Sequence, residues 1–305
     1  MSQRGERRTR RSPRRSLRGL GALVLTAALW GSSFSVIKVV VSEVGSFTYT
    51  WVRSTIAILG LSPYVAYAAR RGRLTREAAL GGLMTGLAYA LGLWLQGWGT
   101  GLTSASNSAF ITGLNVVFVH AYSALTAKEY RLSLATSLAL SVAGLYLLTA
   151  PGAGFNVGDL LILLGAFMWA AQVLLVARYS RCDPGVFTFF EMAPALAFAI
   201  PDLIMAGTGR GGPRAFSPLA LLLLAYLALA CSDLAFALQV LGQRHLSPAA
   251  AAIVLLLEPV FAAFFAYLAL GEAMGTLQAL GASLILAAMA SACLSEASRA
   301  EDRHI

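Results

Sequence analysis

The chain has 305 residues, of which 58% are hydrophobic and only 12% are charged, and its formal net charge is +9. A soluble domain carries about 25% charged residues, and folding this composition in water would leave large apolar patches exposed. With a mean hydropathy of +0.71, the composition excludes a soluble globular protein and predicts an integral membrane protein.

The chain begins with an arginine-rich stretch, RGERRTRRSPRRSLR, which is followed by an apolar run of about 23 residues. The stretch resembles a nucleic-acid arm and, with the apolar run, a signal peptide. The run is longer than a signal-peptide core and lacks a small-x-small cleavage site. We therefore expect a retained first helix, with the arginines acting as orientation signals rather than as an RNA or lipid-headgroup site.

Ten apolar windows of roughly 20 residues follow along the chain, each long enough to cross a hydrocarbon core of about 30 Å. Short joints marked by glycine, proline or charge separate them, as in SEVGS, RRGRLTRE and RCDPG. The predicted spans are 19–41, 47–69, 78–98, 102–125, 132–150, 159–177, 185–206, 217–240, 247–270 and 276–294.

The basic residues favour one orientation of these spans. With the N-terminus inside, almost all of the 23 basic residues fall in cytoplasmic segments. The exceptions are Arg210 and Arg214 in an outside loop, and Lys38 and Arg53 within spans. Ten spans with both termini cytoplasmic, in a cell (inner) membrane, satisfy this bias.

Other residue types argue against cofactors and catalysis. The three cysteines, Cys182, Cys231 and Cys293, form no disulfide framework or metal spacing, and we interpret them as packing residues. No Walker A pattern is present, and the few histidines do not cluster with carboxylates at catalytic metal spacing. We expect no cofactor, no metal and no enzyme activity.

The two halves of the chain resemble each other. LWGSSFSVIK in the first span matches FMWAAQVLLVAR in the sixth, which aligns Trp30 with Trp169. Later, TSASNSAFITGLNVVF parallels LSPAAAAIVLLLEPVF and sets Asn115 against Glu258. Five spans per half is an odd number, so the second half must enter the membrane in the opposite orientation. Such inverted repeats are a common construction of secondary transporters.

These stretches, with FTYTWVRSTIAIL in the second span and LEPVFAAFFAYLALGEAMGTLQALGASLILA at the ninth and tenth, resemble the EamA family of the drug/metabolite transporter superfamily. The resemblance covers about residues 20 to 294 and implies an all-α polytopic membrane protein. It implies ten transmembrane helices in two inverted five-helix repeats, alternating access to a central cavity, and transport of small metabolites, often outward. The implied division is a basic cytoplasmic tail (1–18), a first repeat (19–150), a second repeat (159–294) and a cytoplasmic C-terminal tail (295–305).

Two positions depart from the family pattern. Asn115-Val116 stands where the first repeat often has a proline, which argues against a helix break there. Ala127-Lys128-Glu129 replaces the usual Gly-Glu pair that ends the helix.

Glu258 is the strongest site candidate, because it lies near the middle of its span, where a charge costs at least about 3 kcal/mol. Pro259 lacks an N–H and crowds the carbonyl of Leu255, so that turn can open. A carboxylic acid beside loosened backbone suits proton coupling or pairing with a substrate amine. The alternative is a structural glutamate bonded to a neighbouring helix.

Two shallower acids join Glu258 as candidate coupling residues. Asp233 lies nearer the cytoplasm, seven residues after Tyr226 on the same predicted helical face. Glu191 precedes Pro194 and Pro201, which with Pro259 are candidate hinges. Each acid has a packing role as its alternative.

Trp30 and Trp169 lie about ten residues inside their spans rather than at the interface where tryptophan usually gathers, so they are candidate walls of a substrate cavity. The fourth span carries a polar stripe of Ser104, Ser108, Thr112 and Asn115, which also suits helix packing. We interpret Lys38 as a snorkelling residue, with Glu43 or an anionic substrate as alternative partners, and Arg53 as structural. The residues expected to line the cavity are Trp30, Ser33, Tyr89, Trp94, Gln96, Ser108, Thr112, Asn115, Trp169, Gln172, Asp233 and Glu258.

The sequence thus predicts a secondary transporter, an exporter of a small organic metabolite such as an amino acid or an amphiphilic amine. Its partners are that small molecule, the lipid bilayer and protons. The alternatives are an intramembrane enzyme acting on lipid-linked substrates, which requires convergent carboxylates at one membrane face, and a non-transporting scaffold or sensor.

Overall fold

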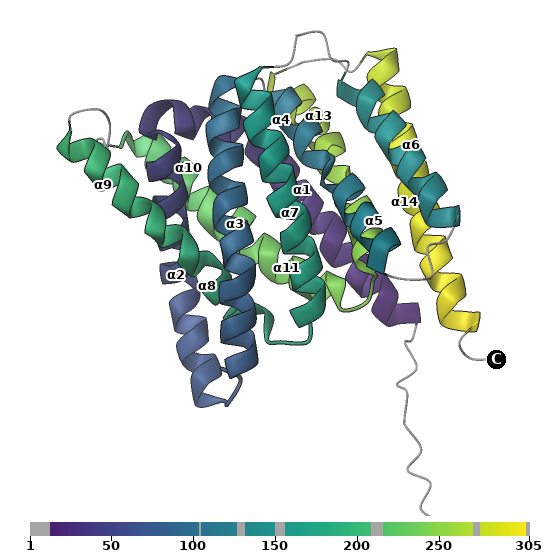
Figure 1. Ribbon diagram of the computed structural model, residues 1–305, viewed down its shortest axis with the longest axis horizontal. Coiled ribbons are helices and arrows are strands. Elements are labelled where there is room, and N and C mark those ends of the chain that lie inside the picture. Colours follow the sequence, from purple (N-terminus) through teal and green to yellow (C-terminus); the bar gives the residue numbers. More distant parts are fainter. Residues whose placement is uncertain are drawn as a thin grey trace, which may run out of the picture.

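The computed structural model describes residues 13–103, 105–126, 132–149, 156–208, 216–270 and 275–302. Every regular element within these ranges is a helix, so the described chain is all-α (Figure 1). The first half contains α1 (Pro13–Val44), α2 (Ser46–Arg70), α3 (Arg76–Leu102), α4 (Ala105–Gly113), α5 (Asn115–Thr126) and α6 (Leu132–Thr149).

The second half is more interrupted, because short 3₁₀ and π-helical segments join some of its α-helices. Its elements are α7 (Val157–Tyr179), α8 (Pro184–Met192), the 3₁₀ segment η1 (Ala193–Phe198), α9 (Ala199–Gly207), α10 (Pro218–Ala228), the π segment η2 (Leu229–Leu234), α11 (Ala235–Gln243), α12 (Pro248–Leu255), α13 (Leu257–Leu270) and α14 (Thr276–Asp302).

Local sequence explains where several of these helices begin. Asp183, Ser217 and Ser247 each accept a hydrogen bond from the backbone N–H three residues later, and each is followed by a proline at the first helical position. An N-cap oxygen satisfies an otherwise free N–H, and proline loses nothing where its N–H would be unpaired. Between α1 and α2 the turn is a single residue, Gly45, whose φ of 79° suits glycine.

Each predicted span coincides with one helix or with consecutive helical segments. Six of these, by length and composition, are able to cross a membrane within the described residues: Leu17–Val44, Arg76–Leu102, Val157–Tyr179, Pro184–Gly207, Pro218–Gln243 and Pro248–Phe265. Three more apolar helices are shorter, and ten crossings stay a prediction. Helix also continues into both predicted tails, since α1 begins at Pro13 and α14 runs to Asp302.

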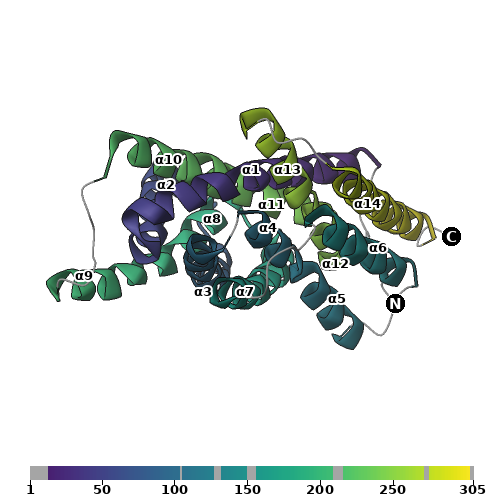
Figure 2. The ribbon, with the colours of Figure 1, turned by 90° about the horizontal axis from the view of Figure 1, so that it is seen from above.

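The helix pairs form a pattern that is symmetric between the halves. The third span of each half packs on the first span of the other: α3 on α7, and α11 on α1. The second spans pack together (α2 with α8), as do the fifth (α6 with α14), and both views show α3 beside α7 and α6 beside α14 (Figures 1 and 2). This exchange symmetry agrees with the duplication inferred from the sequence.

Two helix breaks lie at corresponding places in the two halves. Leu256 separates α12 from α13, as expected from Pro259, because the carbonyl of Leu255 has no N–H to accept at that position. Leu114 separates α4 from α5, so the expectation of an unbroken helix there is wrong. The backbone instead tightens into three-residue hydrogen bonds, from Leu114 N–H to Ile111 and from Val117 N–H to Leu114.

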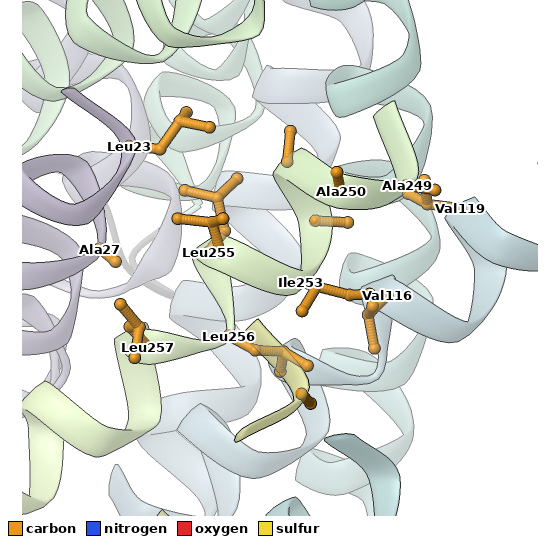
Figure 3. Packing of buried hydrophobic residues seen from close by; sticks show 14 of the residues in the cluster. Leu23, Ala27, Val116, Val119, Ala249, Ala250, Ile253, Leu255, Leu256 and Leu257 are labelled. Carbon is orange, nitrogen blue, oxygen red and sulfur yellow. The ribbon is translucent and has the colours of Figure 1, made fainter. Parts of the chain in front are cut away.

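The two breaks lie against each other in the middle of the molecule. A Cβ on Gly113 would lie 3.0 Å from a methyl carbon of Leu256. Beside them, α12 is buried along its length (Figure 3), with Leu23 and Ala27 of α1 on one side and Val116 and Val119 of α5 on the other. This packing therefore places both helix breaks close to Glu258, which follows Leu256 by two residues.

The start of α1, the α2–α3 turn, the α7–α8 turn and the end of α14 lie at the same end of the bundle (Figure 1). The two turns carry several arginines, among them Arg70, Arg71, Arg73 and Arg181. We call this end the basic end.

Candidate functional site

A small cavity lies between the two halves, and both contribute to its walls. Its volume is about 30 Å³, room for roughly two water molecules when one needs about 10–15 Å³. In this conformation the cavity is therefore too small to hold an organic metabolite. The lining residues are Trp30, Ser33, Ile37, Arg53, Leu93, Gln96, Thr112, Asn115, Trp169, Gln172, Val173, Phe236 and Glu258. Eight of the residues predicted from the sequence are thus brought together.

Glu258 enters the cavity in the first turn of α13, directly after the break at Leu256. Its side chain is 9% exposed, and it forms no hydrogen bond or ion pair within the described part of the chain. A close backbone approach holds α13 in place, because a Cβ on Gly31 of α1 would lie 2.5 Å from the carbonyl oxygen of Glu258. The acid therefore faces the cavity without a protein partner.

Arg53 is a cavity residue that the sequence interpretation assigned to a structural role. Its side chain is 3% exposed. Its Nε donates to Ser232 Oγ at 2.9 Å and its Nη1 to the Tyr49 hydroxyl at 2.5 Å, with the guanidinium 5.6 Å from the Tyr49 ring centre. An arginine inside an apolar span is a signal for a functional residue. Arg53 was nevertheless assigned a structural role, because it lies near the start of its predicted span.

The aromatic wall consists of Trp30, Trp169 and Phe236. The ring centre of Phe236 lies 4.9 Å from that of Trp30 and 6.1 Å from that of Trp169. Trp30 Nε1 donates to the carbonyl of Cys231 at 3.0 Å, whereas Trp169 Nε1 is buried without a hydrogen-bond partner among the described residues. Phe236 was not foreseen, since a phenylalanine in an apolar run carries no distinguishing signal.

Tyr89 lies behind this wall rather than in the cavity lining. Its ring meets Trp169 and Phe236 edge-on, with centres 6.0 and 5.1 Å away, and its hydroxyl lies 3.5 Å from Ser232 Oγ. It therefore supports the aromatic wall and the segment that holds Arg53.

The polar stripe of the fourth span divides between the cavity and the helix packing. Gln96 Nε2 donates to Thr112 Oγ1 at 3.1 Å, and both residues and Asn115 line the cavity. Ser108 lies outside the lining and pairs with Thr100, with 2.6 Å between their hydroxyl oxygens. Ser104, the first member of the stripe, lies outside the described residues.

Glu191 belongs to a buried amide network adjacent to the cavity. Gln172 Nε2 lies 2.7 Å from Glu191 Oε1 and 2.9 Å from Gln239 Oε1, and Gln239 Nε2 donates back to Gln172 Oε1 at 3.0 Å. The second oxygen of Glu191 has no partner in the described chain. Glu191 thus reaches the cavity only through Gln172.

Trp94 lies outside the central cavity, in a separate aromatic cluster. Its ring centre is 5.2 Å from those of Phe47 and Trp98 and 5.3 Å from that of Phe198. The physical reason is helical phase: Leu93 and Gln96 point into the cavity, and each residue of a helix turns about 100° from the last.

Asp233 also lies outside the central cavity. It lines a larger groove, of about 1010 Å³, which begins at the α2–α3 and α7–α8 turns of the basic end. The π turns of η2 interrupt the 3.6-residue period that set Asp233 on the face of Tyr226. Its Oδ1 has no partner among the described residues, and a Cβ on Gly60 would lie 2.8 Å from its Oδ2.

The mouth of this groove carries both signs of charge. Arg73 lies 3.9 Å from Asp183, which also accepts a 2.9 Å hydrogen bond from the Tyr64 hydroxyl. Arg244 donates to the carbonyls of Ser180 and Cys182. Burial raises the pKa of the Cys182 thiol, so the groove does not present a nucleophilic thiolate at neutral pH.

At the other end of α1, Lys38 donates to the carbonyl of Thr103. The alternative pairing with Glu43 is wrong, because Glu43 instead accepts from the backbone N–H of Ser217 at 2.7 Å and from its hydroxyl at 2.9 Å. Neither residue lines the cavity.

The three candidate hinge prolines lie at different kinds of places. Pro259 follows the break before α13, Pro194 lies in the 3₁₀ segment η1, and Pro201 lies in α9. The Pro194 ring packs closely on α3, where a Cβ on Gly86 would lie 2.7 Å from it.

Comparison with known proteins adds the family. A model of the EamA-like transporter family matches the chain twice, over residues 17–150 and 156–292. Two proteins of Archaeoglobus fulgidus, each described as an uncharacterized transporter, are similar to this chain. The first is 30% identical, over 88% of this chain and 83% of its own length. The second is 26% identical, over 87% of this chain and 93% of its own length. A solved crystal structure shares the fold, with a TM-score of 0.71 at 19% identity over 90% of this chain and 96% of that one. Because the family model matches both halves and covers nearly the whole chain, this chain belongs to the EamA-like transporter family and is a membrane transporter.

Proposed function

We propose that the protein is a secondary transporter that moves a small organic metabolite, such as an amino acid or an amphiphilic amine, out of the cell across the inner membrane. The observation that carries this proposal is the cavity between the two halves, where Glu258 forms no hydrogen bond or ion pair with the described residues and stands beside a broken helix. Sites at the interface of repeats, built from discontinuous helices, are typical of secondary transporters.

Transport requires the small cavity to widen and to open alternately toward the two sides. The two halves, inverted relative to each other, rock about the contact between the breaks at Leu114 and Leu256, with Pro259, Pro194 and Pro201 as compliant points. With both termini cytoplasmic, the groove of the basic end faces the cytoplasm and is the entrance for an exported compound. Arg53, which lines the cavity, bonds to Ser232, and Ser232 directly precedes the groove residue Asp233.

Protons are the proposed coupling ion. A membrane-buried carboxyl group that a substrate or proton can neutralise is suited to coupling, because carrying its charge through the bilayer centre is costly. Glu258 lies in the cavity, Asp233 in the groove and Glu191 in the amide network between α7 and α8. This separation supports transport over an intramembrane enzyme, which requires carboxylates that converge on one reacting group.

A ligand panel tests the proposal. The purified protein is heated with each of a set of amino acids, amines and organic acids, and its unfolding temperature is followed. A compound that binds the folded protein alone raises this temperature in a concentration-dependent way. Saturable uptake of such a compound into proteoliposomes supports the proposal; a panel in which nothing binds and nothing is taken up contradicts it.

A further inference from the structure

The central cavity contains a buried cation as well as a buried acid. Arg53 has only neutral hydrogen-bond partners, the hydroxyls of Ser232 and Tyr49. Within the described chain it forms no ion pair, and no hydrogen bond of its Nη2 occurs. A guanidinium inside a membrane bundle is costly unless an anion faces it, so an anion bound on this side of the cavity would stabilise Arg53.

Neither nearby acid forms an ion pair with Arg53 in the described chain, although Asp233 is near enough to interact with it electrostatically. Asp233 follows Ser232 directly in the chain, but its carboxyl group lines the groove of the basic end and its Oδ2 is directed toward Gly60. Glu258 lines the same cavity as Arg53 from α13, yet the two form no ion pair. The cavity therefore has a cationic side on α2 and an acidic side on α13.

The surroundings of Arg53 hold its guanidinium in one orientation. Ser232 belongs to the π segment η2, which is also tied to α1 through the hydrogen bond from Trp30 Nε1 to the carbonyl of Cys231. Tyr49 is fully buried one turn before Arg53 on α2. A guanidinium fixed in this way loses little freedom when it binds a ligand, and its planar fork matches a carboxylate.

We infer that Arg53 is the anion-binding residue of the transport cavity and that it selects substrates carrying a carboxylate. The substrate is then a zwitterion: its carboxylate binds Arg53, its ammonium group faces Glu258, and its apolar part packs on Trp30, Trp169 and Phe236. This inference rests on the proposed function and adds to it a residue that discriminates acids from amines without a carboxylate.

The experiment compares matched compounds in proteoliposomes. L-Phenylalanine, L-phenylalaninamide and N-acetyl-L-phenylalanine share one side chain and differ only in the charged groups, and the leucine set provides a second side chain. Competition is measured against the labelled parent amino acid. In the wild-type protein, we expect the amide to compete at least tenfold more weakly than the acid, and the N-acetyl compound to be weakened as well.

The variants test whether Arg53 causes this preference. In Arg53→Gln the amide should compete nearly as strongly as the acid, so the ratio of the two competition strengths should fall close to one. Arg53→Lys should restore part of the preference for the acid. Lys38→Gln is the matched control, because it removes another cation of the same half that does not line the cavity, and it should leave the ratio unchanged. If Arg53→Gln does not fold, Ser232→Ala keeps the charge but removes the 2.9 Å bond that orients it, and should lower the ratio.

The outcomes separate the two proposals. Equal transport of acids and amides by the wild-type protein, or an unchanged ratio in Arg53→Gln, overturns the role of Arg53 while transport itself stands. Uptake confined to compounds without a carboxylate also overturns it. Failure of the whole metabolite panel to bind or to be taken up contradicts the transporter proposal instead.

Discussion

At the scale of single residues, the cavity combines features that the sequence revealed to different degrees. Glu258 could be identified because an acid in the middle of an apolar window is rare and costly. The tryptophans were identifiable for a similar reason, as they lie away from the interface where they usually gather. Phe236 and Gln239 could not be identified, because nothing in an isolated apolar run indicates which face meets the other half.

Replacing Glu258 with glutamine tests the coupling role. We expect uptake in proteoliposomes to lose its response to an imposed pH step, because the glutamine amide does not ionise and so cannot carry a coupled proton. Glu301→Gln is the control: that glutamate lies near the end of α14, and the described linings of the cavity and the groove do not include it. The flux of a hit compound is measured with and without the pH gradient, and a Glu258→Gln protein that responds like the wild type contradicts the coupling proposal.

At the scale of elements, the sequence predicts helix starts and one of the two central breaks. Proline after an N-cap residue marks the starts of α8, α10 and α12, and Pro259 marks the break before α13. The break at Leu114 and the π turns of η2 have no such local signal. They depend on contacts with distant elements, such as Gly113 against Leu256 and Trp30 against Cys231.

The close contact between α1 and α13 gives an element-scale prediction. Gly31→Ala places a Cβ 2.5 Å from a backbone oxygen and 2.7 Å from Phe261 Cβ, so α13 must shift and carry Glu258 with it. Such overpacking costs about 1–3 kcal/mol. We expect a lower unfolding temperature and reduced uptake.

Gly21→Ala is the control for this substitution, since a Cβ at that position on the same helix meets nothing within 4 Å. It should unfold and transport like the wild type. Equal stability and uptake of the two alanine variants would show that the contact does not set the position of α13.

At the scale of the whole molecule, two matching halves line a small cavity, while a groove of about 1010 Å³ begins at the basic end. The sequence predicted the duplication and the all-helical class, because hydropathy and repeated motifs are read along the chain. It did not predict that Asp233 lies in the groove and Trp94 in an outer cluster, because helical phase across a π segment and the pairing of helices between halves are properties of the packed molecule.

The central claim is that the metabolite passes through the cavity between the halves. Asn115→Phe tests it most directly, because the larger side chain fills a space of about 30 Å³. Leu125→Phe, on the same helix at a position that is 88% exposed, is the matched control. Saturable uptake of a hit compound into proteoliposomes should fall at least tenfold in Asn115→Phe and remain at the wild-type level in Leu125→Phe, with both variants folded. Wild-type uptake by a folded Asn115→Phe protein would contradict the account.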